Sequence, residues 1–314
     1  MHALVPLPVA VPLAAAAILG GLGHFLPRRL VDGLAIATAA AVAGISAVLV
    51  VGSADRPIHY VFGGWHARGR VVPGIVFAVD PLAASLAALA GVLTLAALAF
   101  AWHYFDDVVP LFHVLILCFL AGMVGFALSD DLFNLFVFFE LMSIGAFSLT
   151  GYRIDEPGPL QGALAFGVLN MLAGSLLALG LALVYGRTGA LNLADAGAAL
   201  AGRPPDTLVV VAFGLLCAGF LVKAGVPPFH FWLADAYAAA PAPVCVLLSG
   251  VMSDLGIHAI GRVYSTGFSG AFAGREDAVR AILVALGVAG ALLAAVMGFL
   301  QAELKRMLAY LTAS

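Results

Sequence analysis

Residues 223–244 read KAGVPPFHFWLADAYAAAPAPV, a stretch in which a lysine and two adjacent prolines interrupt an apolar run. Pro227 and Pro228 lack backbone N–H donors, and their rings prevent a helix from continuing through them. Because the apolar pattern resumes at Phe229 to Tyr237, we predict a helix that breaks after Lys223 and then restarts. Inside a membrane, such breaks persist only where protein or a water-filled cavity satisfies the exposed backbone groups, and transporters build ion sites from them. A kink that serves packing alone is the alternative.

The composition of the whole chain indicates a membrane protein. Of its 314 residues, 63% are hydrophobic and 10% are charged, whereas about 25% of a typical soluble domain is charged. Because about 20 apolar residues are needed to span a bilayer as a helix, we predict an all-α, multi-pass integral membrane protein. A tenth run begins near Lys305, after nine complete ones: Leu4 to Phe25, Val31 to Val51, Pro81 to Trp102, Val109 to Leu128, Asp131 to Tyr152, Leu160 to Tyr185, Leu208 to Val226, Ala242 to Tyr264 and Ala278 to Leu300.

The longest polar interruption runs from Gly52 to Val79. It contains Gly63 to Trp65, with the letters GGW, and an apolar patch from Val71 to Val79. Such a patch beside turn residues is typical of a short β-hairpin. We therefore expect a hairpin at the surface, between the second and third helices.

Two other linkers have recognisable features. Asp130 and Asp131 separate two apolar runs with almost no linker, so the fourth and fifth helices must be antiparallel, and either aspartate can cap the fifth helix. Gly189 to Gly202 alternates small and apolar residues around Asp195, a pattern that fits a short interfacial helix. A plain loop is the alternative for that segment.

Three ionisable residues lie deep within separate apolar runs. Glu140 comes nine residues after Asp131, which places it about 13 Å along its helix and near the middle of the bilayer. Lys223 and Asp254 are similarly deep. Each unpaired charge at that depth costs on the order of 3 kcal/mol. A purely structural ion pair between Glu140 and Lys223 is one explanation, but three such groups on separate helices favour a proton path.

Histidines lie near these charges. His258 follows Asp254 by one helical turn and is a candidate member of the same path. His230 follows the two prolines and could line the path with them, although a packing or capping role is equally compatible with the pattern. Asp80 and His113 lie near helix ends, where solvated or capping roles are expected.

Three stretches together resemble a known family. They are DLFNLFVFFE at Asp131 to Glu140, the broken-helix segment at Lys223 to Val244, and ELKRMLAY at Glu303 to Tyr310, with GGW as weaker support. Their order and spacing are similar to those of the antiporter-like membrane subunits of Mrp-type cation/proton antiporters, respiratory complex I and membrane-bound hydrogenases. The similarity looks closest to the D-type member of the Mrp antiporter subunits.

The resemblance implies a fold of about fourteen helices with two inverted five-helix repeats, each containing a broken helix and a central lysine. On this basis, residues 1–108 are expected to form three N-terminal helices with the hairpin, and residues 109–264 the complete first repeat with the broken seventh helix. Residues 278–314 would begin a second repeat that is truncated at Ser314, and a truncated gene is the expected explanation.

The resemblance also implies roles for individual residues. In the family, a glutamate of the fifth helix pairs with a lysine of the seventh, which passes a proton toward a lysine of the eighth. Glu140 and Lys223 match the first two positions, but Asp254 occupies the third, and His258 stands where an aromatic residue is frequent. Lys305 also matches a family position, and its place beside Arg306 at a helix start favours an interfacial role.

These observations lead to a functional hypothesis. We expect a proton-translocating subunit of a multisubunit membrane complex, with Glu140, Lys223, Asp254 and His258 as relay residues and other membrane subunits as partners. The transported ions are protons, with sodium as a further candidate, and the location is the lipid bilayer of a bacterial plasma membrane.

Other functional classes are less well supported. A non-conducting structural or assembly subunit remains open, because Asp254 replaces the relay lysine. We expect no catalytic site in the chain itself, no metal and no cofactor, since neither metal-ligand spacing nor a serine elbow is present, although a place in a redox-driven complex is compatible with the pattern. The sequence contains no basic cluster typical of nucleic-acid binding.

Overall fold

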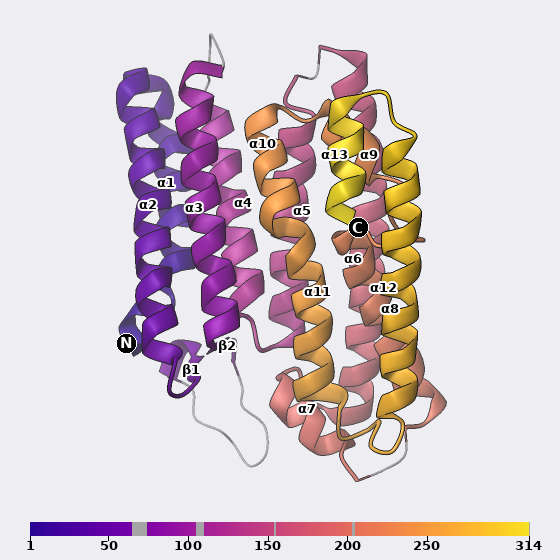
Figure 1. The fold of residues 1–314 in the computed structure, drawn as a ribbon. Coiled ribbons are helices and arrows are strands. Elements are labelled where there is room, and N and C mark those ends of the chain that lie inside the picture. The colour runs from indigo at the N-terminus through magenta and orange to yellow at the C-terminus, as the bar shows by residue number, and fades with distance from the viewer. Residues whose placement is uncertain (65–73, 105–109, 154, 203–204, 314) are drawn as a thin grey trace.

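The structure, a computed structural model, describes residues 1–64, 74–104, 110–153, 155–202 and 205–313 (Figure 1). Within these ranges nine helices are long and apolar enough to cross a membrane, which confirms the predicted class. The helices are α1 Leu7–Leu22, α2 Arg28–Ser53, α3 Pro81–Tyr104, α4 Pro110–Leu128, α5 Leu132–Thr150, α6 Pro157–Thr188, α7 Leu193–Leu200, α8 Thr207–Ala224, α9 Leu233–Ala239, α10 Ala242–Leu247, α11 Ser253–Arg262, α12 Glu276–Phe299 and α13 Leu304–Ala313.

Shorter elements complete the chain. Short 3₁₀ turns occupy His2–Leu4, Gly23–Phe25 and Phe62–Gly64, and two π-helical segments, Leu248–Met252 and Val263–Phe268, flank α11. As a result α10, the first π-helical segment, α11 and the second form one continuous span, Ala242–Phe268. Because α7 is too short to span, α8 is the seventh spanning helix. The helix that begins near Lys305, as expected, is α13.

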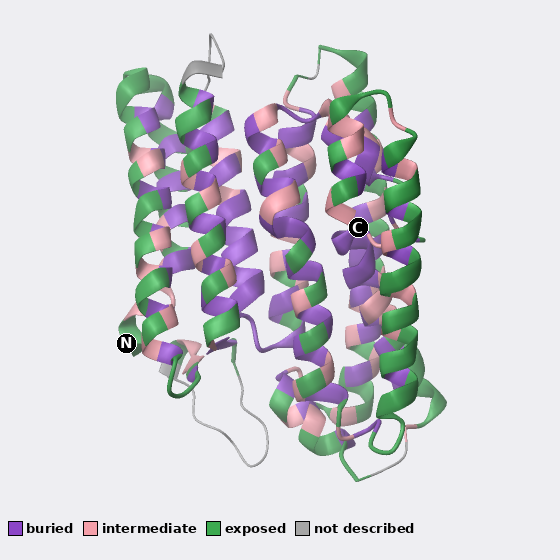
Figure 2. Cartoon of the chain, in the orientation of Figure 1, coloured by how far each residue is buried: buried purple, intermediate pink, exposed green. Residues whose placement is uncertain are grey.

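The core lies around α4, which is apolar on all its sides and contacts α1, α3, α5 and α11. A helix that is apolar all round is typical of an interior position. By contrast, α12 is exposed along most of its length, as the green ribbon in Figure 2 shows. The bundle therefore packs around a buried helix, α4, whereas α12 lies at its edge.

The predicted hairpin is present. Strand β1, Ile58–Val61, pairs antiparallel with β2, Val76–Val79, and all four residues of β2 are buried, so only part of the hairpin lies at the surface. Trp65 and the first residues of the apolar patch fall outside the described residues. The backbone N–H of Asp130 donates to Val76 O at 3.0 Å, and that of Leu193 donates to Asp130 O at 3.1 Å. The linker between α4 and α5 is thus held between the hairpin and the start of α7.

Local caps explain where two of these helices begin. Asp131 caps α5, since its Oδ1 accepts from the Asn134 backbone N–H at 2.9 Å. The side chain of Asn192 caps α7 in the same way through the N–H groups of Ala194 and Asp195. The short helix expected between Gly189 and Gly202 is therefore confirmed, and the loop alternative is wrong.

Candidate functional site

The break after Lys223 is a complete interruption of the helix and not a kink. α8 ends at Ala224 because Gly225 takes a left-handed conformation, with φ of 68°, and the prolines follow. The next helix, α9, begins at Leu233, so the restart predicted at Phe229 was four residues too early. The indole Nε1 of Trp232 donates to Val222 O at 2.9 Å, a carbonyl that also accepts from the Gly225 N–H at 3.1 Å, so Trp232 ties the segment after the break to the end of α8.

The side chain of Lys223 lies at this break and is completely buried, with 0% exposure. Its Nζ donates a hydrogen bond to Ser143 Oγ on α5 at 2.6 Å. The same Nζ lies 4.3 Å from the centre of the Phe139 ring, close enough for a cation–π contact. One hydroxyl and one ring face therefore replace the water that an exposed ammonium group would bind.

Glu140 lies on α5, the fifth helix, as the sequence predicted, one helical turn before Ser143. Its carboxylate packs against α6, where a Cβ atom added at Gly174 would overlap Oε1, so a larger residue there would displace the carboxylate. The described residues include no direct ion pair between Glu140 and Lys223. The simple structural ion pair is therefore not what the geometry contains, because Lys223 contacts Ser143 instead.

Asp254 and His258 form no hydrogen bond or ion pair with Glu140 or Lys223 within the described residues. Asp254 is exposed on α11, beside Ile257, which is 58% exposed, and it forms no hydrogen bond or ion pair within the described residues. His258 Nε2 lies 3.2 Å from Ala127 O at the end of α4. The structure thus brings Glu140 and Lys223 together and leaves Asp254 on the outer face of α11.

His230 lies inside the break, next to the two prolines, and is 8% exposed. Its ring stacks on Phe231 with the centroids 4.8 Å apart, and Tyr310 of α13 lies 6.3 Å away. These contacts are typical of a histidine packed in the protein interior. That Pro227, Pro228 and His230 line a proton path stays a prediction.

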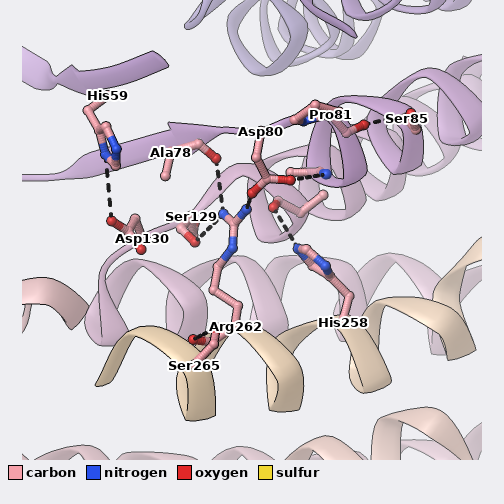
Figure 3. A network of polar contacts seen from close by, with 12 residues as sticks. His59, Ala78, Asp80, Pro81, Ser85, Ser129, Asp130, His258, Arg262 and Ser265 are labelled. Carbon is pink, nitrogen blue, oxygen red and sulfur yellow. Dashed lines mark hydrogen bonds and ion pairs between the residues drawn. The ribbon is translucent and has the colours of Figure 1, made fainter. Parts of the chain in front are cut away.

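A second polar cluster lies at the hairpin side of the bundle (Figure 3). Arg262, at the end of α11, forms an ion pair with Asp80 and donates from Nη1 to Ala78 O at 3.0 Å and to Ser129 O at 3.1 Å. Asp80 also caps α3 by accepting from the Ala83 N–H at 2.9 Å, which confirms its expected capping role. One arginine therefore joins α11 to the hairpin, to α3 and to the end of α4.

Two buried carboxylates adjoin this cluster. Burial raises the pKa of Asp130 and of Asp131 above the usual value for aspartate. Arg262 and the exposed His59 lower the pKa of Asp130 and so act against the effect of burial. The Nδ1 atom of His59 lies 3.9 Å from Asp130 Oδ2. The positive charge of Arg262 therefore offsets part of the unfavourable burial of Asp130.

His113 does not have the solvated or capping role expected from its place near a helix end. It is 3% exposed, and its Nε2 lies 2.8 Å from Oδ1 of the buried Asp32 on α2. The sequence prediction was wrong because α2 covers this end of α4, which only the packing of the helices reveals.

Two residues of α13, Lys305 and Arg306, bind the second half of the broken helix, α9. Lys305 Nζ donates to Ala240 O at 2.9 Å, and Arg306 Nη2 lies 2.9 Å from Asp235 Oδ1. A cation near the last carbonyls of a helix is favourable for both the hydrogen bonds and the helix dipole. Together with Arg153, these residues line a polar cavity of about 310 Å³ at the end of the bundle opposite the hairpin (Figure 1).

The sequence reasoning missed Ser143, Gly174 and Arg262. Ser143 follows Glu140 by three residues, the spacing that places two side chains on the same helix face, so this signal was available. No comparable signal identifies Gly174 or Arg262, because their partners lie on other helices.

Comparison with known proteins agrees with this geometry. A family model described as NADH:quinone oxidoreductase/Mrp antiporter, TM, matches residues 129–314. The chain belongs to this family. Among its curated relatives are the N subunit of the NADH-quinone oxidoreductase of Desulforudis audaxviator, 32% identical, and the D subunit of a probable K(+)/H(+) antiporter of Rhizobium meliloti, 36% identical. The alignments cover 88% and 82% of this chain and 55% and 48% of the relatives, so the chain spans about half the length of the curated relatives it matches.

A solved structure supports the same assignment to the NADH:quinone oxidoreductase/Mrp antiporter family. A chain of the Mrp complex from Dietzia sp. DQ12-45-1b superposes with a TM-score of 0.87 at 27% identity, covering 100% of this chain and 57% of that one. The resemblance inferred from the three sequence stretches, and the antiporter-like helix bundle that it implied, are therefore confirmed.

Proposed function

We propose that this family member is a proton-translocating, cation/proton antiporter-like subunit of a multisubunit membrane complex. Lys223 is the base that takes up and releases the proton, and Glu140 is the carboxylate that controls its charge. The observation that carries this proposal is the fully buried Lys223, placed at a helix break and hydrogen-bonded to Ser143, which lies one helical turn from Glu140 on α5.

The physical basis is a balance of opposing effects on Lys223. Burial disfavours its ammonium form, whereas a nearby ionised carboxylate, the Ser143 hydroxyl and the Phe139 ring stabilise that form. Because these contributions oppose one another, a change in hydration or in the charge of Glu140 shifts the balance between the ammonium form and the neutral amine, and so loads or releases a proton. A buried lysine can act as a switch for this reason.

The remaining assignments follow from the relatives. We propose other membrane subunits as partners, because the curated relatives carry subunit names. Protons are the proposed substrate, with sodium as a second candidate, in the lipid bilayer of a bacterial plasma membrane. We also propose the division into residues 1–108, 109–264 and 278–314, supported by the buried position of α4 at the start of the second segment.

A second candidate function is a non-conducting structural subunit. The observation that favours it is Asp254, which stands in place of a relay lysine and faces outward without a partner among the described residues. The following two predictions separate the candidates.

Replacing Glu140 by glutamine in the assembled complex is expected to lower ion-coupled transport by at least about tenfold, because the carboxamide cannot carry the charge that controls Lys223. Protein abundance in the membrane should change little, since glutamine has nearly the same shape. Transport in membrane vesicles and abundance by immunoblot are the two measurements. The matched control is Glu303→Gln, because the Glu303 side chain is 53% exposed and pairs only with Arg306 of its own segment. Equal losses of transport and abundance for Glu140→Gln would support the structural function.

Asp254→Asn is expected to lower transport by about tenfold, whereas Asp254→Lys should retain more activity, since a lysine at this position can also take up and release a proton. An ionised carboxylate facing acyl chains costs about 3 kcal/mol, so we expect Asp254 to be neutral for much of a cycle and His258 to exchange protons with it. The measurement is proton transport by each variant within its complex. Unchanged transport by Asp254→Asn would remove Asp254 from the relay.

A further inference from the structure

One face of α6 lies along the pair formed by Glu140 and Lys223. Phe166, Asn170 and Gly174 are spaced by four residues, so their side chains lie one above another on this face. The Phe166 end is near the lysine, because the ring centre lies 6.0 Å from Lys223 Nζ. The Gly174 end meets the carboxylate of Glu140. Along the axis of α6, Asn170 therefore lies between the end that is near Lys223 and the end that meets the Glu140 carboxylate.

Asn170 has an unusual hydrogen-bonding state. The residue is completely buried, and its Nδ2 donates to Phe166 O at 3.0 Å. Its Oδ1 is buried and accepts no hydrogen bond from any described residue. Buried acceptors without a donor are rare and unfavourable, so a donor is expected to reach this oxygen at some stage of the protein's activity.

The two neighbouring titratable groups differ in what they can offer. An ionised carboxylate has no proton to donate and is repelled by a carbonyl oxygen, whereas a protonated carboxyl group is a donor. The protonated form of Glu140 therefore suits Asn170 Oδ1. At the other end, Ser143 Oγ accepts from Lys223 and donates its own proton to Phe139 O at 2.7 Å.

We propose that Asn170 is a positioning residue of the relay, which stabilises the protonated form of Glu140 beside Lys223; this inference rests on the proposed function. When the Glu140 carboxylate takes up a proton, it becomes a carboxylic acid whose O–H donates to Asn170 Oδ1. When it releases that proton, the hydrogen bond to Asn170 is lost and the carboxylate is ionised again beside Lys223. Asn170 thus stabilises the state in which the proton is on Glu140.

The test compares the pH dependence of transport by Asn170 variants in the complete complex. Asn170→Leu removes the acceptor, so the pH of half-maximal transport should move by about one unit toward lower pH. Asn170→Asp has almost the same shape and adds negative charge, so its profile should move toward higher pH. The control is Ser175→Ala, because Ser175 is an exposed residue of the same helix that donates only to Met171 O, and its profile should match the wild type.

The outcomes separate this inference from the proposed function. If Asn170→Leu and Asn170→Asp both keep the wild-type profile while Glu140→Gln is inactive, the positioning role is overturned and the proposed function stands. If Glu140→Gln transports as well as the wild type, the proposed function itself fails. Should Asn170→Leu not assemble, Asn170→Ala decides, because it also removes the acceptor, needs no additional space and adds no charge; an unshifted profile of that variant contradicts the inference.

Discussion

Replacing Lys223 by methionine should lower ion-coupled transport by at least about 100-fold, because no other basic side chain contacts the break at the level of Glu140 within the described residues. Folding should not suffer in proportion. A methionine fills a similar volume and removes a buried charge, and such replacements of buried ionic groups are often neutral or stabilising. The expected result is therefore a stable, assembled and inactive complex.

The two measurements are transport in membrane vesicles and thermal stability of the purified complex in detergent. The chain contains one other lysine, Lys305, and Lys305→Met is the matched control. Because Lys305 caps α9 through Ala240 O, its replacement should lower stability more than Lys223→Met does and should reduce transport less. Substantial transport by Lys223→Met would contradict the proposed role of the lysine.

Replacing Arg262 by methionine should destabilise the protein by about 2 to 3 kcal/mol. The arginine side chain is 6% exposed, and its loss leaves Asp80 without its ion-pair partner and two backbone carbonyls without a donor. The estimate lies at the lower end of the values for buried pairs because Asp80 is 32% exposed and partly hydrated.

The measurement is the unfolding midpoint of the purified protein in detergent. Arg187→Met is the matched control, because Arg187 pairs with Asp206 at 3.0 Å with side chains that are 38% and 46% exposed. An exposed pair contributes about 0 to 1 kcal/mol, so the control should unfold almost as the wild type does. Equal midpoints for the two variants would show that the Arg262 contacts contribute little.

Much of the fold was predictable from the sequence because a bilayer places simple requirements on a chain. Runs of apolar residues must be long enough to span it, and prolines beside Lys223 must break a helix. The Asp80 to Arg262 pair was not predictable, because its members are 182 residues apart and charge alone does not identify neighbouring helices. The Asp32 to His113 pair was missed for the same reason.

The candidate site was predictable only in its charged residues. Glu140 and Lys223 are conspicuous because charges are unfavourable in hydrocarbon. Ser143 and Asn170 are not conspicuous, since serine and asparagine in membrane helices commonly bond to backbone carbonyls of their own helix, as both do here. The outward position of Asp254 depends on how α11 is rotated against α8, which apolar periodicity does not fix when most faces of a helix are apolar.

The two halves of the broken helix both pack against α6 but differ in their other contacts. α8 packs in addition against α11, whereas α9 is tied to α13 by Lys305 and Arg306. The turns of residues 225–232 and the hydrogen bond from Trp232 to Val222 O connect them. Because α13 contacts α9 through two charged side chains, a displacement of α13 would act first on the segment beyond the break, whereas Lys223 belongs to α8. Movement elsewhere in an assembly can in this way alter the surroundings of the lysine without moving the helix that carries it.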